Sequence, residues 1–266
     1  MNVTEALTMR FGDVGEVPEA VASLADMASR GVCRAYAPTP LEPGLVHALA
    51  ALALSSPSKS DLQQRDIVIV SDPEIRARLD AITGFDWQPS APALLVFCAN
   101  HARFHHCHEM AGIEIQNDHL DGFFNASVDA AIALSAFISA AERIGLGCCP
   151  LSVLRNDAKQ VSDLLDLPER VIPIAGLTLG WPAQPSKISP RLSLEATVHE
   201  NRFRSDQQAG IREYNQRRGS PPRQRDPQRF GEKPDYGWSD EKARQYADPQ
   251  RADWGAFVRS KGFSLD

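Results

Sequence analysis

The amino-acid sequence predicts a body of the α+β or α/β class, followed by a C-terminal segment of different composition. Stretches whose apolar residues recur at helical spacing alternate with short apolar runs typical of buried strands, and no stretch repeats itself. Turn dipeptides such as Asn-Gly are missing between the apolar runs, which argues against a purely β fold. With 266 residues and 43% hydrophobic content, the chain can bury a substantial core.

The first half of the chain predicts two helices, then a strand and a third helix. Residues 17–28 and 43–54 have apolar side chains at helical spacing. Residues 66–72 (DIVIVSD) form a short β-branched run, and the helical pattern returns over residues 74–82. We therefore expect helix, helix, strand and helix in this order.

The second half adds two strands and a long apolar helix. Residues 93–99 (ALLVFCA) read as a buried strand, as do residues 171–180, whose Pro173 favours an edge strand or a strand start. Residues 125–143 are apolar nearly all the way round a helix, which places this helix in the core or at an interface. A closing helix is expected over residues 253–261.

Composition changes near residue 200. From Asn201 onward there are 14 Lys and Arg and 10 Asp and Glu, which gives a net charge of +4. Because the whole chain has a net charge of -6, residues 1–200 have a net charge of -10. Residues 217–238 are rich in Pro, Gly and charge, which predicts an extended arm. The expected division is therefore a domain over residues 1–200 and an extension over residues 201–266.

Cysteine usage and hydropathy favour a soluble cytoplasmic protein. The five cysteines are an odd number without disulfide-like spacing, and the N-terminus has no basic segment followed by an apolar run. Charged or polar residues interrupt every apolar stretch before it reaches the ~20 residues that cross a bilayer.

Two arginines in the segment SRGVCRAY provide a candidate anion site. Arg30 and Arg34 are four residues apart in a predicted loop, and two planar guanidinium groups suit a phosphate dianion. The alternative is a solvated loop with surface ion pairs.

Two further segments have ligand-binding composition. Residues 55–63 (SSPSKSDLQ) offer hydroxyls and backbone N–H groups, although a serine-rich loop is also simply a turn. Residues 145–157 (GLGCCPLSVLRND) have glycines that allow a ligand to approach the backbone; the alternative is a helix end that enters a strand.

Taken in order, these segments resemble the nitroreductase superfamily, with its arginine loop, its PSxxNxQ-like loop, its GLG segment and its GWP end. Residues 190–203 (PRLSLEATVHENRF) resemble the PRLP...VHEN signature of the NADPH-dependent nitroreductase and flavin reductase branch. The resemblance covers roughly residues 25–223. It implies an α+β fold with a central mixed, mainly antiparallel sheet flanked by helices.

The resemblance also implies FMN as cofactor, with its phosphate on Arg30, Arg34 and Arg191. The matching positions that contact the cofactor are Arg30, Gly31, Val32, Cys33, Arg34, Ser58, Lys59, Ser60, Gln88, Cys149, Pro150, Leu151, Ser152 and Arg191. No side chain is expected to be catalytic, because the flavin performs the redox chemistry.

Donor, acceptor and assembly follow from the same resemblance. NADPH (or NADH) is the expected electron donor, and its 2'-phosphate would meet Arg218 and Arg223 of the C-terminal arm. Asp61 lies at the position beside the pocket of a small electron-poor acceptor. The family's members are intertwined homodimers with FMN at the interface, which suits the apolar helix over residues 125–143.

This chain departs from the family pattern at the phosphate loop and in the acceptor pocket. Val32 replaces the usual serine, and Ser189 stands where the branch has lysine, with Lys187 two residues earlier. Asp61 adds negative charge where relatives often have Asn or an aromatic residue. The phosphate is therefore expected to depend more heavily on the three arginines.

Two other functions compete with the nitroreductase reading. A flavin reductase on the same fold differs only in acceptor, which pocket shape decides. A nucleic-acid-binding protein would use the basic C-terminal segment and its aromatic residues, but the body of charge -10 would repel a polyanion.

The histidine-rich stretch raises the question of a metal. His101, His105, His106, Cys107 and His108 lie within eight positions, but the spacing matches no known site, and only two or three of them could converge. The resemblance aligns this stretch with a surface connection, so no metal is expected.

Overall fold

The computed structural model describes all 266 residues, which form two compact units built from separate stretches of chain. The sheet unit consists of Val32–Ser186 and Arg251–Asp266, and the helical unit of Met1–Gly31 and Lys187–Gln250. The units therefore do not follow the predicted division at residue 200. The roles expected for the two parts of the chain stay predictions.

The sheet unit is built on four antiparallel strands in the order β1-β2-β4-β3. Three of them confirm the predicted strands within two residues, and the antiparallel pairing agrees with the expected α+β fold. The strands are β1 (Arg65–Val70), β2 (Ala93–Asn100), β3 (Gly147–Leu151) and β4 (Val171–Gly180).

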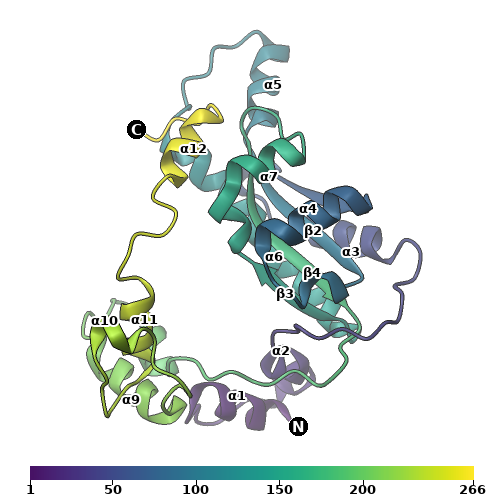
Figure 1. The fold of residues 1–266 in the computed structure, drawn as a ribbon. Helices are drawn as coiled ribbons and strands as arrows, with labels where there is room; N and C mark the ends of the chain where they lie inside the picture. The colour runs from purple at the N-terminus through teal and green to yellow at the C-terminus, as the bar shows by residue number, and fades with distance from the viewer. The chain divides into compact units, whose positions relative to one another are not determined.

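Helices cover both faces of this sheet (Figure 1). Because successive side chains of a strand point to opposite faces, Leu95 and Phe97 of β2 pack on one helical layer, and Leu94 and Val96 on the other. The first layer is α3 (Leu45–Leu54) with α6 (Leu120–Arg143), and the second is α4 (Pro73–Thr83), η4 (Val153–Asp157) and α7 (Ala158–Leu164).

Of the two positions that Pro173 predicted, the edge strand is wrong, since β4 lies between β2 and β3, whereas Pro173 does lie near the start of β4 as its third residue. The pairing register shifts there: Phe97 faces Ala175, and the next residue, Cys98, faces Pro173. Ile174 is thus the extra residue of a β-bulge. Proline has no N–H to donate, and a bulge is one of the few interior positions that tolerates it.

The helix α6 begins at Leu120, five residues before its predicted start, and has two distinct faces. Its small or apolar residues Ala126, Ala133 and Phe137 are buried against the sheet. Leu120, Phe124 and Val128 on another face are exposed. By length and composition α6 could cross a membrane, but core helices of soluble proteins pass the same test.

Two elements of the sheet unit differ from expectation. The histidine-rich stretch, expected as a surface connection, forms the helix α5 (Ala102–Ala111). After α6 the chain enters β3, so the alternative reading of residues 145–157 as a helix end followed by a strand is confirmed.

The C-terminal helix α12 (Trp254–Ser260) confirms the predicted closing helix and completes the sheet unit. Its Phe257 and Val258 are buried with Phe263 against Ile172 of β4 and Ala126 of α6. The last 16 residues therefore close a hydrophobic cluster of the sheet unit.

The helical unit contains short helices from the first 31 residues and from residues 187–250. Val3 and Ala6 pack against Ala28 and Ile188. The helix predicted over residues 17–28 is instead a 3₁₀ segment followed by one α-helical turn. The elements are α1 (Val3–Phe11), η1 (Glu19–Leu24), α2 (Ala25–Ser29), α8 (Leu194–Thr197), α9 (Gln208–Arg218), α10 (Pro227–Phe230) and α11 (Trp238–Gln245).

Residues 217–238, predicted as an extended arm, are folded around aromatic side chains. Tyr236 is buried, accepts a hydrogen bond from the backbone N–H of Arg225 and donates one to Glu241. The guanidinium of Arg244 lies over the rings of both Tyr236 and Phe230. Aromatic anchors and cation–π contacts thus order a segment whose Pro and Gly content suggested an extended arm.

Candidate functional site

The segment that carries Arg34 is fixed against the strand β3. The backbone N–H of Cys33 donates to the carbonyl of Cys148 over 3.0 Å, and that of Ala37 donates to the carbonyl of Trp181 over 2.8 Å. A Cβ atom at Gly147 would lie 2.5 Å from the sulfur of Cys33, so only glycine allows this approach. Residues 32–34 and 149–152, both within stretches predicted to contact the cofactor, are therefore neighbours in the sheet unit.

Arg34 itself is exposed, with its guanidinium beside the thiol of Cys149. Burial raises the pKa of the Cys149 thiol, and the neighbouring Arg34 offsets part of this increase through its charge and a hydrogen bond. The thiol stays protonated at neutral pH, so Arg34 has no anionic partner there. Its positive charge is available to an external anion.

Tyr36 supports this corner from within. Its hydroxyl donates to the carbonyl of Cys33 over 3.0 Å and lies 2.8 Å from the hydroxyl of Thr178, which donates to the carbonyl of Cys149. Burial raises the pKa of Tyr36, which therefore remains a neutral structural donor. The network joins both predicted cofactor segments to β4.

The loop that contains Ser58, Lys59 and Ser60 is anchored to α6 by a buried carboxylate. Asp129 is 1% exposed and accepts hydrogen bonds from the hydroxyl of Ser58 at 2.7 Å and from the backbone N–H of Lys59 at 3.2 Å. It also accepts from the backbone of Gln64 and pairs with the buried Arg65 at 3.4 Å. The Ser58 side chain is thus used within the protein.

The next residues of this loop are presented to solvent. Ser60 and Asp61 have positive φ angles of 51° and 55°, a left-handed conformation that side chains rarely adopt without support from their surroundings. Asp61 lines a cavity of about 400 Å³ together with Phe104, Cys107 and His108 of α5. An aromatic ring and a carboxylate therefore meet at the position predicted for the acceptor.

Gln88 has a different environment from the other predicted contacts. Its side chain is completely buried, and its amide nitrogen donates to Asp80 over 2.5 Å. Asp80 in turn forms an ion pair with Arg76 at 3.0 Å. The amide oxygen of Gln88 has no hydrogen-bond partner. The Gln88 side chain, at the start of η3 (Gln88–Ser90), is thus used for packing within the sheet unit.

The remaining predicted phosphate ligands belong to the helical unit, where the buried Arg10 joins their segments. Its guanidinium donates to the carbonyls of Ala28 (3.0 Å), Arg30 (2.5 Å) and Ser189 (3.3 Å). The carbonyl of Arg10 accepts the backbone N–H of Arg191 at 2.6 Å. One arginine of α1 thereby holds the Arg30 and Arg191 segments together.

Arg217 of α9 adds a second clamp to the same segment. Its guanidinium donates to the carbonyl of Arg10 over 3.0 Å and to the carbonyl of Arg191. Tyr214 donates to the carbonyl of Pro190 over 3.0 Å. The Arg191 side chain is exposed and bonds only to carbonyls beside it in the chain, those of Ser189 and Pro190.

Arg218 and Arg223, the arginines predicted for the donor, are both exposed. Arg218 ends α9, where its guanidinium donates to the hydroxyl of Tyr214 over 2.6 Å. Arg223 lines an open cavity of about 760 Å³ that also contains Arg225 and Glu241. Both guanidinium groups are accessible to a dissolved anion.

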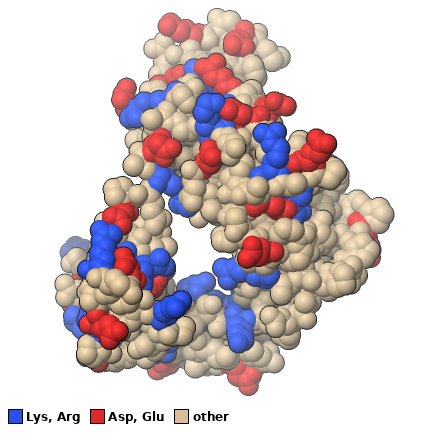
Figure 2. All heavy atoms as spheres, viewed as in Figure 1, with Lys and Arg blue, Asp and Glu red and all other residues tan.

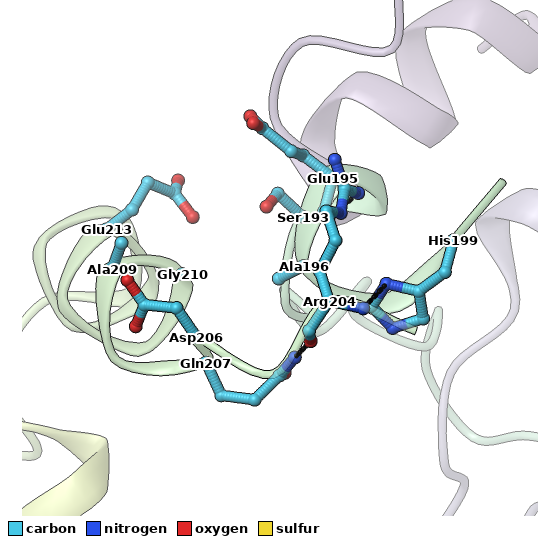
Figure 3. A pocket seen from close by; sticks show the side chains of 10 residues that line it. All are labelled: Ser193, Glu195, Ala196, His199, Arg204, Asp206, Gln207, Ala209, Gly210 and Glu213. Carbon is cyan, nitrogen blue, oxygen red and sulfur yellow. Dashed lines mark hydrogen bonds between the residues drawn. The ribbon is translucent and has the colours of Figure 1, made fainter. Parts of the chain in front are cut away.

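A second cavity of the helical unit, of about 390 Å³, lies between α8 and α9 (Figure 3). Glu195 lines one side and Glu213 the other, with Asp206 at the turn between them. Arg204 also lines the cavity, but its guanidinium donates to the carbonyls of Glu195 and Val198 at the end of α8. Three carboxylates make this cavity unsuitable for a phosphate.

Two supporting residues, Arg10 and Asp129, were not predicted from the sequence, and only one of them left a signal there. Arg10 stands in an N-terminal stretch for which no helix was expected, and nothing local marks it as buried. Asp129 did leave a signal, because it is the single charged residue in the apolar run from residue 126 to residue 141. An acidic residue on an apolar helix needs a buried partner, and here that partner is Arg65 with the Ser58 loop.

Comparison with known proteins gives consistent results for both parts of the chain. The model of the Nitroreductase family matches residues 27–181, and that of the Nitroreductase family, C-terminal domain, matches residues 189–266. An FMN reductase (NAD(P)H) of Bacillus subtilis is 33% identical over 190 residues, which cover 70% of this chain and 74% of that protein.

Two further relatives extend the comparison. An oxygen-insensitive NADPH nitroreductase of Salmonella typhimurium is 34% identical over 171 residues, 64% of this chain and 70% of that protein. The solved structure of an NADPH:FMN oxidoreductase from Vibrio harveyi, complexed with NAD+, has a TM-score of 0.77 and 28% identity. The superposition covers 90% of this chain and 97% of the Vibrio harveyi chain.

Proposed function

The chain belongs to the nitroreductase family and is an FMN-dependent NAD(P)H oxidoreductase, and we propose that it anchors the FMN phosphate with Arg34 at the end of β3. The observation that carries this proposal is the exposed guanidinium of Arg34, held beside a neutral thiol on the rigid edge of the sheet. Backbone hydrogen bonds from Cys33 to Cys148 and from Ala37 to Trp181 hold the Arg34 segment in place, which positions a ligand more accurately than a free loop would.

The donor set of these segments fits a phosphorylated flavin. A dianion requires cationic donors, and Arg30, Arg34 and Arg191 are three guanidinium groups in the segments that the family uses. Val32 provides no hydroxyl where the family has serine, so the arginines would carry the phosphate. Backbone groups of Cys149 to Ser152, with Lys59 and Ser60, are proposed to contact the ring system.

Bound FMN would take two electrons from the reduced nicotinamide and pass them to the acceptor, so donor and acceptor bind in turn and the kinetics are ping-pong. Backbone N–H groups near the flavin are proposed to stabilise the negative charge that the reduced ring gains. Asp61 and Phe104 would border the acceptor, a nitroaromatic or quinone-like compound that stacks on the ring.

We propose NADPH as the donor, with its 2'-phosphate on Arg218 and Arg223. Both side chains are exposed, and the acidic cavity between α8 and α9 is a poor competitor for this phosphate. The NADPH-flavin reductase reading remains the close alternative, because it shares fold, cofactor and donor and differs only in the acceptor.

The nucleic-acid alternative is not favoured. Basic side chains of the helical unit lie among acidic ones on the face that Figure 2 shows, without forming a continuous basic surface. Several of these cations are already paired at 2.5–2.8 Å: Arg225 with Glu241, Arg229 with Asp248 and Lys233 with Asp240. Paired charges contribute little to phosphate-backbone binding.

We further propose that the protein is a soluble cytoplasmic homodimer. A row of exposed apolar side chains on α6 supports the dimer: Leu120 is 49% exposed, Phe124 60% and Val128 38%. These residues are four positions apart and form one stripe on the helix. A second copy of the chain would cover this stripe, as the family's homodimers imply.

The decisive experiment is the absorbance spectrum of the purified protein with and without added FMN. We expect a yellow protein with bound oxidised flavin. Arg34→Ala should weaken FMN binding about tenfold or more, because a charged hydrogen bond contributes roughly 1.5–3 kcal/mol. Flavin fluorescence titration measures the dissociation constant.

The matched control is Arg78→Ala, which removes an exposed arginine of α4 in the same unit. It should leave FMN affinity unchanged. A wild-type protein that stays colourless with added FMN would contradict the cofactor assignment. If both variants lost FMN affinity equally, the assignment of the phosphate to Arg34 would be contradicted, but the cofactor assignment would not.

A further inference from the structure

Three side chains from different segments converge beside the first turn of α5. His101 immediately precedes the helix, His105 lies one turn later, and Asp118 lies in the segment that leads to α6. One ligand atom from each residue lies within 4.8 Å of the others. Nε2 of His101 is 3.8 Å from Oδ1 of Asp118, and Nε2 of His105 is 3.6 Å from Oδ2.

Both imidazoles direct an unpartnered nitrogen into this cluster. His101 is 2% exposed, and its Nε2 has no hydrogen-bond partner. Nε2 of His105 is also buried and unpartnered. A buried polar atom without a partner is costly, and two that face the same carboxylate indicate a shared missing ligand.

The surroundings of His101 suit a ligand role. The side-chain amide of Gln64 lies 2.6 Å from Nδ1, and its oxygen has no partner. A half-turn of this amide would let Nδ1–H donate to the oxygen, which leaves the lone pair of Nε2 directed at the cluster. Histidine ligands commonly donate their other ring N–H in this way.

We propose that His101, His105 and Asp118 bind a divalent transition-metal ion of the Zn²⁺ class, with solvent as the fourth ligand. Two histidines at positions i and i+4 lie on one helical face, and two nitrogens with one carboxylate are a common zinc ligand set. His105 and Asp118 are partly exposed, with side-chain exposures of 14% and 29%, which gives the ion a path of entry.

Arg170 affects which cation the cluster selects. Its guanidinium lies 3.4 Å from Oδ2 of Asp118 and leaves Oδ1 as the ligating oxygen. Its positive charge weakens the contribution of Asp118, so the affinity comes mainly from the two imidazoles. Metals that bind nitrogen strongly are therefore favoured over Mg²⁺ and Ca²⁺, which require several oxygen ligands.

The ion would fix α5 at its N-terminal end. This helix also carries Phe104, Cys107 and His108, which line the cavity beside Asp61. A metal at His101 and His105 would therefore tie one wall of this cavity to the segment that begins α6. Its role is structural, because the reaction itself requires no metal.

The test uses the full-length FMN-loaded protein, treated with a chelator and then titrated with Zn²⁺ against a chromophoric competitor. We expect one tight zinc per chain and a melting temperature higher by about 5 °C or more at saturating metal. Both His105→Ala and Asp118→Ala should weaken binding about 100-fold or more and abolish the thermal shift. Neither residue is deeply buried, so FMN content reports whether each variant folds.

The matched control is His106→Ala, on the same helix but 68% exposed and paired with Glu109. It should retain the tight zinc, which separates the cluster from the other histidines and Cys107. Co²⁺ bound to the wild-type protein should give the visible absorption of a four-coordinate site. Zinc binding that survives His105→Ala, or is lost in His106→Ala, would overturn the proposal, as would absent Co²⁺ bands.

Discussion

At the scale of single residues, Asp129 is the side chain on which the Ser58 loop depends most. Its carboxylate accepts from the loop and from the buried Arg65. Replacing Asp129 by Asn removes the negative charge that pairs with Arg65. It also places an NH₂ group, which is itself a donor, against the groups that donate to the carboxylate. We expect the free energy of unfolding to fall by about 3 kcal/mol, the cost of an uncompensated buried charge. Urea denaturation measures it.

The comparison for this prediction is Asp121→Asn on the same helix. The Asp121 side chain is 46% exposed, and its Oδ2 lies 3.6 Å from Nζ of Lys59, whose side chain is 48% exposed. Such a substitution should change stability by no more than about 0.5 kcal/mol. If both variants lost equal stability, the special role of the buried carboxylate would be refuted.

At the level of residues, a sequence can indicate chemistry that is local, whereas tertiary contacts leave little signal in it. The Arg34 and Cys149 segments were selected by composition, and the structure places them side by side. Gln88 was placed among the cofactor contacts by the resemblance, and its burial and its hydrogen bond to Asp80, eight residues earlier, left no signal in the sequence. Arg10 lies 179 residues from one of its acceptors, Ser189, which no local pattern can indicate.

At the scale of elements, hydrophobic runs predicted the interior strands and α6, because burial on both faces leaves a continuous apolar stretch. The edge strand β3 contains Gly147 and Pro150, both unfavourable in strands, and a strand there was therefore only the alternative interpretation of residues 145–157. Pro173 suggested an edge strand, but a β-bulge allows this proline in the interior strand β4. The helix α5 was not predicted, because none of its residues is buried and it therefore lacks a clear apolar face at helical spacing.

The end of α9 supports a prediction about donor choice. Arg218→Ala should raise the Michaelis constant for NADPH about tenfold and leave that for NADH nearly unchanged, because only NADPH has the 2'-phosphate. Steady-state rates with each donor, at a fixed acceptor concentration, measure the two constants.

A neighbouring arginine on the same helix provides the comparison for α9. Arg212 is exposed, and its guanidinium contacts Gln208 at 3.4 Å. Arg212→Ala should leave both Michaelis constants unchanged. Equal increases for NADPH and NADH in Arg218→Ala would remove the 2'-phosphate assignment and indicate a general loss of structure at the end of α9.

For the whole molecule, the division into units could not be predicted in chain order. Composition changes near residue 200, but Arg10 and Arg217 tie the first 31 residues to the segment after Lys187. The chain then returns to the sheet unit with α12, whose Phe257 and Phe263 complete a core cluster. Such pairings of distant segments depend on three-dimensional fit, which a single sequence does not display.

The assembly of two chains makes a prediction for the complete protein. Phe124 is the most exposed apolar residue of the α6 stripe, and Phe124→Glu would place a charge in the proposed dimer contact. Burying an unpaired carboxylate is costly, so the dimer should dissociate to chains of 29.2 kDa. Light scattering after gel filtration gives the mass. If FMN lies at the interface, as the family's dimers imply, flavin content should fall in parallel.

The same charge placed elsewhere shows whether the stripe is special. Met110 of α5 is 89% exposed and lies outside the α6 stripe, so Met110→Glu should remain dimeric with full flavin content. A wild-type mass of one chain would contradict the dimer directly. A Phe124→Glu dimer would show that another surface joins the chains, and dissociation with retained flavin would place the cofactor within a single chain.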